Sequence, residues 1–204
     1  MTTKTAPALT LSKVVNRLHQ KLLEVQTDPA LYVFTLIFIM LVVKYLLLTR
    51  LTSNTAEFLS SYKFAFSDSY DWIANGVGLF NNDSITFRNP GLVLIIKFLY
   101  VFNALFLLPL LNNMVFFLLI LFVYKLSFLV ASKNIALIVA IFLALNFTIN
   151  LNVNYIMADI YCLIFIAASL YYLLKRKYSY SFLLLGGSIL FQNIGYLLLP
   201  VWLS

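Results

Sequence analysis

The sequence has few of the side chains that hold metals or form disulfides. Cys162 is its one cysteine and His19 its one histidine. A lone cysteine forms no disulfide within the chain, and this composition argues against a metal site built on histidine or cysteine. Charge is scarce as well, because 10% of the residues are charged whereas 63% are hydrophobic, which excludes an ordinary soluble domain. The basic residues are scattered or flank apolar runs, so the net charge of +7 does not indicate nucleic-acid binding.

Long apolar runs make up most of the sequence. A run of about 20 apolar residues crosses the roughly 30 Å hydrocarbon core of a bilayer as a helix. We therefore predict an all-α polytopic membrane protein with a membrane domain at residues 29–204. About five transmembrane helices are expected, at residues 29–49, 113–131, 135–150, 160–174 and 182–202.

Residues 1–28 precede the first apolar run. Between Leu11 and Val25, apolar side chains recur at helical spacing and basic residues occupy the other face. This pattern predicts an amphipathic segment on the cytoplasmic surface of an anionic membrane, and a frayed polar tail is the alternative. Asp28 and Pro29 suit the cap and first turn of the first span. Lys44, near the far end of that span, is expected to snorkel outward.

The distribution of basic residues predicts an orientation. The amino terminus and Lys175–Lys177 are basic, so the positive-inside rule places both in the cytoplasm, with an even number of crossings between them. Five apolar runs lie between them, so one does not cross. We assign this role to residues 91–111, which carry Lys97 near the middle, and predict an interfacial or re-entrant helix within a large outer loop at 50–112. The acids that follow the first span then all face the outside.

Charged residues in the outer loop are the candidates for chemistry. Asp68 and Asp71 lie three residues apart, and Arg88 follows before the next apolar run. A carboxylate near lipid suits a general base, and an arginine offers paired donors to phosphate oxygens. This combination favours chemistry on a lipid-linked phosphate. The alternatives are structural: Asp68 caps a helix, Asp71 solvates it, and Arg88 anchors the loop to lipid headgroups.

The order of the motifs resembles that of a known family. The loop has an aspartate, an aromatic residue, an alanine, a glycine and a Pro-Gly helix start, at Asp68, Trp72, Ala74, Gly76 or Gly78, and Pro90-Gly91. This string is similar to the first outer loop of the GT-C superfamily of integral-membrane glycosyltransferases, which includes the protein O-mannosyltransferases and the aminoarabinose transferases of lipid A. Downstream, Asp159 resembles the acid that begins a later span of these enzymes. Lys175–Lys177 and the stretch 186–200 resemble the next cytoplasmic turn and its glycine-rich span, so that the resemblance covers roughly residues 35–200.

The resemblance implies an activity for Asp68. This carboxylate would deprotonate or orient an acceptor hydroxyl, whose oxygen attacks the anomeric carbon of a sugar linked to a polyprenyl phosphate. The site would open to the extracytoplasmic side, and the acceptor would be a glycan, a lipid or a protein. No cofactor is implied, and the use of a divalent metal stays open.

The resemblance also implies which groups surround the donor phosphate. Arg88, and after it Lys63, would stabilise the departing phosphate. Asp159 would support the same cavity, and Asp71 is a weaker candidate because the family pattern does not require an acid there. Family members often carry arginine or lysine where this chain has Gln192, which hydrogen-bonds but brings no charge.

The length of the family members bears on how the chain works. They have further spans, so this chain is expected to be an amino-terminal portion or to depend on a protein partner that supplies the missing spans. The resemblance and the composition favour the inner membrane of a bacterium. Two other functions stay open: a non-catalytic multi-pass membrane subunit, and a small transporter or flippase-like protein with Asp159 and Lys97 as polar sites.

Overall fold

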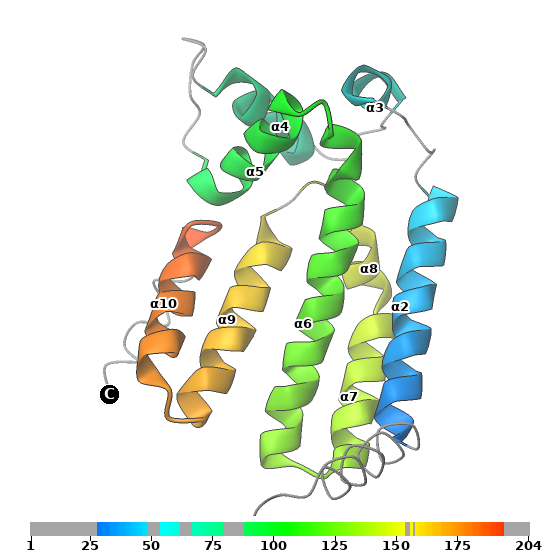
Figure 1. Cartoon of the computed structure of the whole chain (residues 1–204), viewed down its shortest axis with the longest axis vertical. Coiled ribbons are helices and arrows are strands. Elements are labelled where there is room, and N and C mark those ends of the chain that lie inside the picture. Colours follow the sequence, from blue (N-terminus) through cyan, green and yellow to red (C-terminus); the bar gives the residue numbers. More distant parts are fainter. Residues whose placement is uncertain are drawn as a thin grey trace, which may run out of the picture. The chain divides into compact units, whose positions relative to one another are not determined.

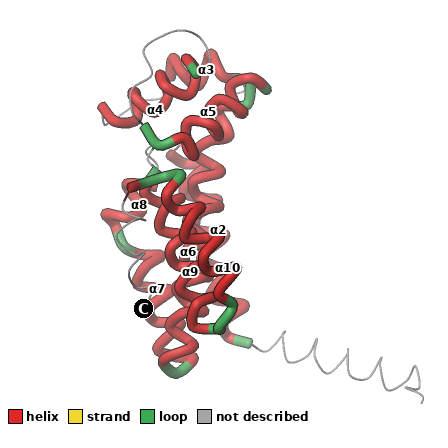
Figure 2. The backbone as a smooth tube through the Cα atoms, turned by 90° about the vertical axis from the view of Figure 1, so that its left-hand side faces the viewer, coloured by secondary structure: helices red, strands yellow, loops and turns green. Residues whose placement is uncertain are grey.

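The structure is a computed structural model that describes residues 28–48, 54–61, 67–79, 88–153, 156 and 158–193. Every regular element in these ranges is a helix and none is a strand, which confirms the all-α prediction (Figure 2). The chain divides into two compact units, residues 1–36 and 37–204, and the contacts described below between separate elements all lie within the second. The predicted amphipathic segment at residues 1–28 lies outside the described residues except for Asp28.

Helix α2 (Pro29–Leu48) begins at the predicted residue. Asp28 Oδ1 accepts a hydrogen bond of 2.8 Å from the Ala30 amide, and Pro29 occupies the first turn, where its missing N–H has no intrahelical partner to lose. Two helices in the described part of the chain are long and apolar enough to cross a membrane, at Pro29–Leu47 and Leu105–Val130.

The remaining long helices are α6 (Leu108–Val130), α7 (Lys133–Leu145), α9 (Asp159–Leu174) and α10 (Tyr178–Ile189). In Figure 1, α6 lies between α7 and α9, and α10 packs on the other side of α9. Short turns join α6 to α7 and α9 to α10 at the same end. Consecutive helices are therefore antiparallel, as expected for a helical bundle with short connections.

Small residues make the contact between α9 and α10. The Ser169 hydroxyl donates to the Ser181 carbonyl at 2.6 Å, and the Ser181 hydroxyl donates back to the Ser169 carbonyl at 2.8 Å. Farther along, a Cβ on Gly187 would come within 2.9 Å of the Phe165 ring, whereas one on Gly186 would meet nothing within 4 Å. Small residues and serine pairs of this kind let apolar helices approach closely.

The predicted span at 135–150 is interrupted. Helix α7 ends at Leu145, Asn146 is extended, and α8 (Phe147–Val153) begins directly after it. The Asn146 side chain accepts from the Ile149 amide at 3.0 Å, so it caps α8 in place of continuing α7. Lys44 of α2, expected to snorkel outward, instead donates to the carbonyl and side-chain oxygens of Asn150 at 3.4 and 3.2 Å.

The predicted helix at 91–111 ends early. Helix α5 (Pro90–Val101) stops at a Schellman turn in which Asn103 adopts φ 52°. The Asn103 amide donates to the Tyr100 carbonyl and the Ala104 amide to the Leu99 carbonyl, which satisfies two of the last carbonyls of α5. The chain resumes as η1 (Leu105–Leu107) and α6. A helix of 12 residues is about 18 Å long, shorter than the hydrocarbon core.

Two further helices of the outer loop are described, α3 (Thr55–Ser61) and α4 (Ser67–Gly78). The Thr55 amide donates to Asn103 Oδ1 at 3.1 Å, which ties α3 to the turn after α5. Helix α4 packs on α5, where a Cβ on Gly76 would overlap the Ile96 side chain, and Lys97 donates to the Val77 carbonyl at 3.0 Å. Together α3, α4 and α5 lie at the end of the unit where α6 and α9 begin (Figure 1).

Candidate functional site

Helix α4 carries the two acids of the predicted site. Asp68 is its second residue, and its backbone lies in the first turn, whereas its side chain and the whole of Lys63 lie outside what the structure describes. Asp71 follows three residues later, close to one helical turn away, and its side chain is 54% exposed. Asp68 therefore lies in the first turn of a helix, and Asp71 lies about one turn farther along it.

Arg88 is held on both sides by residues of α4. Its guanidinium lies 2.9 Å from Asp71 Oδ2 and 5.3 Å from the centroid of the Trp72 ring. The Trp72 side chain is almost fully buried, so the ring is a fixed surface for the cation. An arginine that is bonded to a carboxylate and placed over an indole ring has few orientations open to it. The orientation of the Arg88 guanidinium group is therefore restricted.

The residues after Arg88 connect this segment to the end of α10. The Asn89 amide group donates to the Ile189 carbonyl at 2.9 Å and to Asn193 Oδ1 at 3.2 Å. The Gly91 amide donates to the Leu190 carbonyl at 2.8 Å. Residues that are about a hundred positions apart in the sequence therefore lie side by side.

Gly91 is required for this approach. A Cβ at this position would lie 2.8 Å from the Leu190 carbonyl oxygen and 2.9 Å from the Phe191 ring. Since the nearest atom belongs to the backbone, it cannot move aside as a flexible side chain would. The Pro-Gly pair at the start of α5 thus combines a residue preorganised for the first helical turn with one that admits a neighbouring backbone.

Asp159 and Gln192 form the second polar pair of the site. The Gln192 amide group donates to Asp159 Oδ1 at 2.7 Å. Asp159 is the first residue of α9, where a carboxylate is stabilised by the positive end of the helix dipole. The neutral Gln192 therefore orients this carboxylate without cancelling its charge.

A buried contact joins α4 to the segment that leads into Asp159. The Ile156 amide donates to the Ser69 hydroxyl at 3.3 Å, and both residues are fully buried. Asp68 precedes Ser69, so the backbone of its turn lies against the residues before α9. Asp71, Arg88, Asp159 and Gln192 come from four separate stretches of the sequence and lie at one end of the unit.

Aromatic and amide side chains of α6, α9 and the residue Phe191 pack next to this end of the unit. The Tyr161 ring stacks on the Phe191 ring with centroids 5.2 Å apart, and the Tyr161 hydroxyl donates to Asn112 Oδ1 at 2.7 Å. Asn112 and Asn113 are both buried near the start of α6. This packing holds Phe191, which precedes Gln192, against the first turn of α9, which begins with Asp159. The same packing therefore positions the Asp159–Gln192 pair.

Sequence reasoning missed three contributors. Asn89 and Asn193 bridge the two segments, and Trp72, noted only as part of a motif, contacts Arg88. One signal is available in the sequence, because asparagines next to long apolar runs are costly unless they are hydrogen-bonded. Which asparagine meets which depends on how α5 and α10 pack, and no local pattern specifies that.

No group of three or more histidine, cysteine, aspartate or glutamate side chains close enough to share a metal occurs among the described residues. No protein-family model matches this sequence, and no curated protein or solved structure matches it either.

Proposed function

We propose that this chain carries the donor-side half of a glycosyltransferase site that uses a polyprenyl-phosphate sugar. One observation carries the proposal: four of the six residues selected from the sequence, Asp71, Arg88, Asp159 and Gln192, are paired and lie at the same end of the unit. The fifth, Asp68, belongs to the adjoining turn of α4. The resemblance to GT-C transferases supplies the reaction.

The proposed topology is a multi-pass protein of the bacterial inner membrane with its amino terminus in the cytoplasm. Helices α2 and α6 are long and apolar enough to cross by themselves. Helices α7 and α8 would cross together, α9 and α10 would complete the set of five spans, and α5 would lie at the outer interface. In support, the start of α7, which carries Lys133, and the turn with Lys175–Lys177 lie at one end of the unit, and the helices α3 and α4 and the start of α9, which carry acids, lie at the other.

In the proposed reaction, Asp68 accepts the proton of an acceptor hydroxyl as its oxygen attacks the anomeric carbon of the sugar. The bond between that carbon and the phosphate oxygen breaks, and the polyprenyl phosphate leaves with the bonding electrons. The sugar is transferred with inversion at that carbon. The acceptor is a glycan, a lipid or a protein, and a divalent ion is compatible with the step without being required by it.

Arg88 is proposed to stabilise the departing phosphate. Its orientation is already set by Asp71 and the Trp72 ring, so little reorganisation is needed when charge develops on the leaving oxygen. Lys63 would add a second positive charge. Asp159, held by Gln192, would bind hydroxyl groups of the sugar or the acceptor through its remaining oxygen lone pairs.

A non-catalytic membrane subunit is the second candidate. It is favoured by the many large apolar side chains left exposed on α2, α7 and α10, which are available to lipid or to further helices. The same observation fits the expectation that a transferase of this kind needs further spans. The transporter alternative has less support, because Lys97 is bonded to the Val77 carbonyl in the contact between α4 and α5.

Replacement of Asp68 by asparagine separates these functions. Transfer would be measured in membranes supplied with polyprenyl-phosphate sugars, and loss of a general base should lower it by about 10²–10⁴-fold while membrane insertion is unchanged. Glu57→Gln is the matched control, since it removes one acid from α3 at the same end. Unchanged transfer in Asp68→Asn, together with its loss in Asp159→Asn, would contradict the proposed role of Asp68.

A further inference from the structure

Two lysines share one aromatic ring at the end of the unit opposite to the candidate site. The Lys125 ammonium of α6 lies 5.9 Å from the centroid of the Tyr171 ring of α9, and the Lys175 ammonium lies 6.0 Å from the same centroid. Lys125 also lies 5.5 Å from the centroid of Phe122. The two charges are therefore no more than about 12 Å apart.

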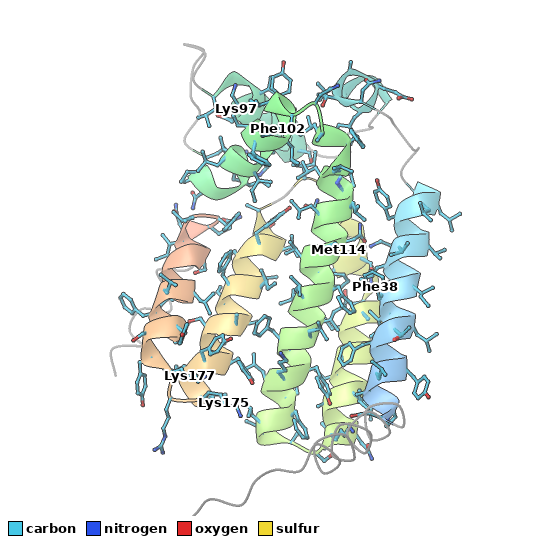
Figure 3. All side chains as sticks on the ribbon, viewed as in Figure 1. Phe38, Lys97, Phe102, Met114, Lys175 and Lys177 are labelled. Atoms are coloured by element: carbon cyan, nitrogen blue, oxygen red, sulfur yellow. The ribbon has the colours of Figure 1, made fainter. Side chains whose placement is uncertain are left out.

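No described acid of this unit offsets these charges. Glu57, Asp68 and Asp71 lie on α3 and α4, and Asp159 is the first residue of α9, at the other end. Figure 3 shows Lys175 and Lys177 at the end away from Lys97. The faces of the aromatic rings stabilise the charges of this lysine pair, and the carboxyl end of the α9 dipole stabilises that of Lys175.

The turn after Lys175 adds a second observation. Arg176 adopts φ 57°, a left-handed conformation that glycine adopts at less cost, and closes a Schellman turn through bonds from Arg176 N to Leu173 O and from Lys177 N to Tyr172 O. The chain thus places a cation where the backbone favours glycine. Uncommon backbone conformations of this kind occur often at sites with a function.

We propose that Lys125 and Lys175, set around Tyr171, bind the phosphodiester of an anionic phospholipid at the cytoplasmic surface of the membrane. The oxygens of one phosphate group would accept charge-assisted hydrogen bonds from both ammonium groups. This binding site is separate from the proposed transferase site and does not depend on that activity. It depends on α6 and α9 crossing the membrane, which brings both ammonium groups to headgroup level.

Exposed apolar side chains identify the ligand as a lipid in preference to a free anion. Phe128, on the last turn of α6, is 52% exposed, and Leu174, next to Lys175, is 55% exposed. The Phe128 ring stacks on Tyr124 one turn earlier on the same helix. A ligand with a phosphate head and acyl chains would satisfy the cations and cover these apolar surfaces together, whereas inorganic phosphate would leave the apolar surfaces exposed.

The proposal is tested by native mass spectrometry of the full chain in detergent with increasing phosphatidylglycerol or phosphatidylcholine. We expect one phosphatidylglycerol to bind more tightly than the rest. Lys125→Gln and Lys175→Gln should each weaken that binding about fivefold, the effect of removing one lysine near an anionic surface. Lys177→Gln, which removes the same charge from the same turn without touching the Tyr171 ring, should weaken it less than about twofold.

Variants of the ring provide a second measurement. Tyr171→Phe keeps the aromatic face and should bind phosphatidylglycerol as the wild type does, whereas Tyr171→Leu should weaken binding about threefold because the lysines lose their shared support. An equal loss in Lys177→Gln would overturn the proposal in favour of a diffuse basic surface. Equal binding of phosphatidylcholine, or displacement of phosphatidylglycerol by millimolar inorganic phosphate, would also overturn it.

Discussion

The two ends of the second unit differ in which partners their charged side chains have. At the end formed by α3, α4 and α5, carboxylates are bonded to partners from distant segments, as in Asp71 with Arg88 and Asp159 with Gln192. At the other end, lysines lie over aromatic rings, with no described acid among them. The first end offers carboxylates beside a cation, whereas the second offers cations alone. The difference places the proposed chemistry at the acid-bearing end.

Replacement of Arg88, the cation paired with Asp71 at the acid-bearing end, should have the largest effect on transfer after that of Asp68→Asn. Arg88→Gln should lower transfer from a polyprenyl-phosphate sugar by about 10²–10³-fold, because one preorganised donor at a developing negative charge has that effect. Arg88→Lys keeps the charge but loses the paired donors, and should fall between Arg88→Gln and the wild type. Lys133→Gln, one charge removed at the opposite end, should leave transfer unchanged. An equal loss in Lys133→Gln would contradict the distinction between the ends.

The packing of α4 on α5 at the acid-bearing end can be tested with two glycines of α4, Gly76 and Gly78. Gly76→Ala should destabilise the protein by about 1–3 kcal/mol, because the added methyl group overlaps Ile96 of α5. Gly78→Ala should be neutral or slightly stabilising, since nothing lies within 4 Å of a Cβ there. The midpoint of thermal unfolding in detergent measures both. A Gly76→Ala variant as stable as Gly78→Ala would show that α4 does not pack on α5 as described.

The helical hairpin of α9 and α10 can be tested in the same way, with Gly187 and Gly186 of α10. Gly187→Ala should lower the unfolding midpoint, because its methyl group would press on the Phe165 ring at 2.9 Å. The ring can shift by a few tenths of an ångström, so we expect a smaller loss than for Gly76→Ala. Gly186→Ala faces open space and should gain up to about 1 kcal/mol from helix propensity. Equal midpoints for the two variants would contradict the described contact between α9 and α10.

The smallest effect on transfer is expected for Asp71→Asn, and it distinguishes the role of Asp71 from that of Asp68. Asp71→Asn should change the KM for the donor by less than about fivefold, because an ion pair with a carboxylate that is 54% exposed contributes about 1 kcal/mol or less. The Trp72 ring still supports Arg88 in that variant. A loss in kcat as large as that expected for Asp68→Asn would instead place Asp71 in contact with the reacting groups.

Local patterns in the sequence predict part of this fold. The start of α2 follows from Asp28 and Pro29, a cap and a first-turn residue that act within one turn. The break at Asn146 is not predicted by hydropathy, because the apolar run continues across it and one side chain decides the outcome. The end of α5 at Val101 is missed for the same reason, since apolar residues resume directly after the Asn103 turn.

The candidate site was predictable residue by residue but not as pairs. Asp71, Arg88, Asp159 and Gln192 stand out in the sequence because polar side chains are rare in it. Their pairing depends on two hydrogen bonds between distant segments, from the Gly91 amide to the Leu190 carbonyl and from the Ile156 amide to the Ser69 hydroxyl. Such contacts arise from the packing of helices far apart in the sequence, which periodicity and hydropathy do not describe.

The most direct test of the account is whether the start of α5 meets the end of α10 in the membrane. In a Cys162→Ala background, Asn89→Cys and Asn193→Cys would be combined and treated with a short thiol cross-linker. A matched pair, Asn89→Cys with Tyr178→Cys, places the second thiol at the far end of α10. The account predicts rapid intramolecular cross-linking of the first pair and none of the second. No cross-link in the first pair, or equal cross-linking of both, would contradict the convergence on which the proposed site rests.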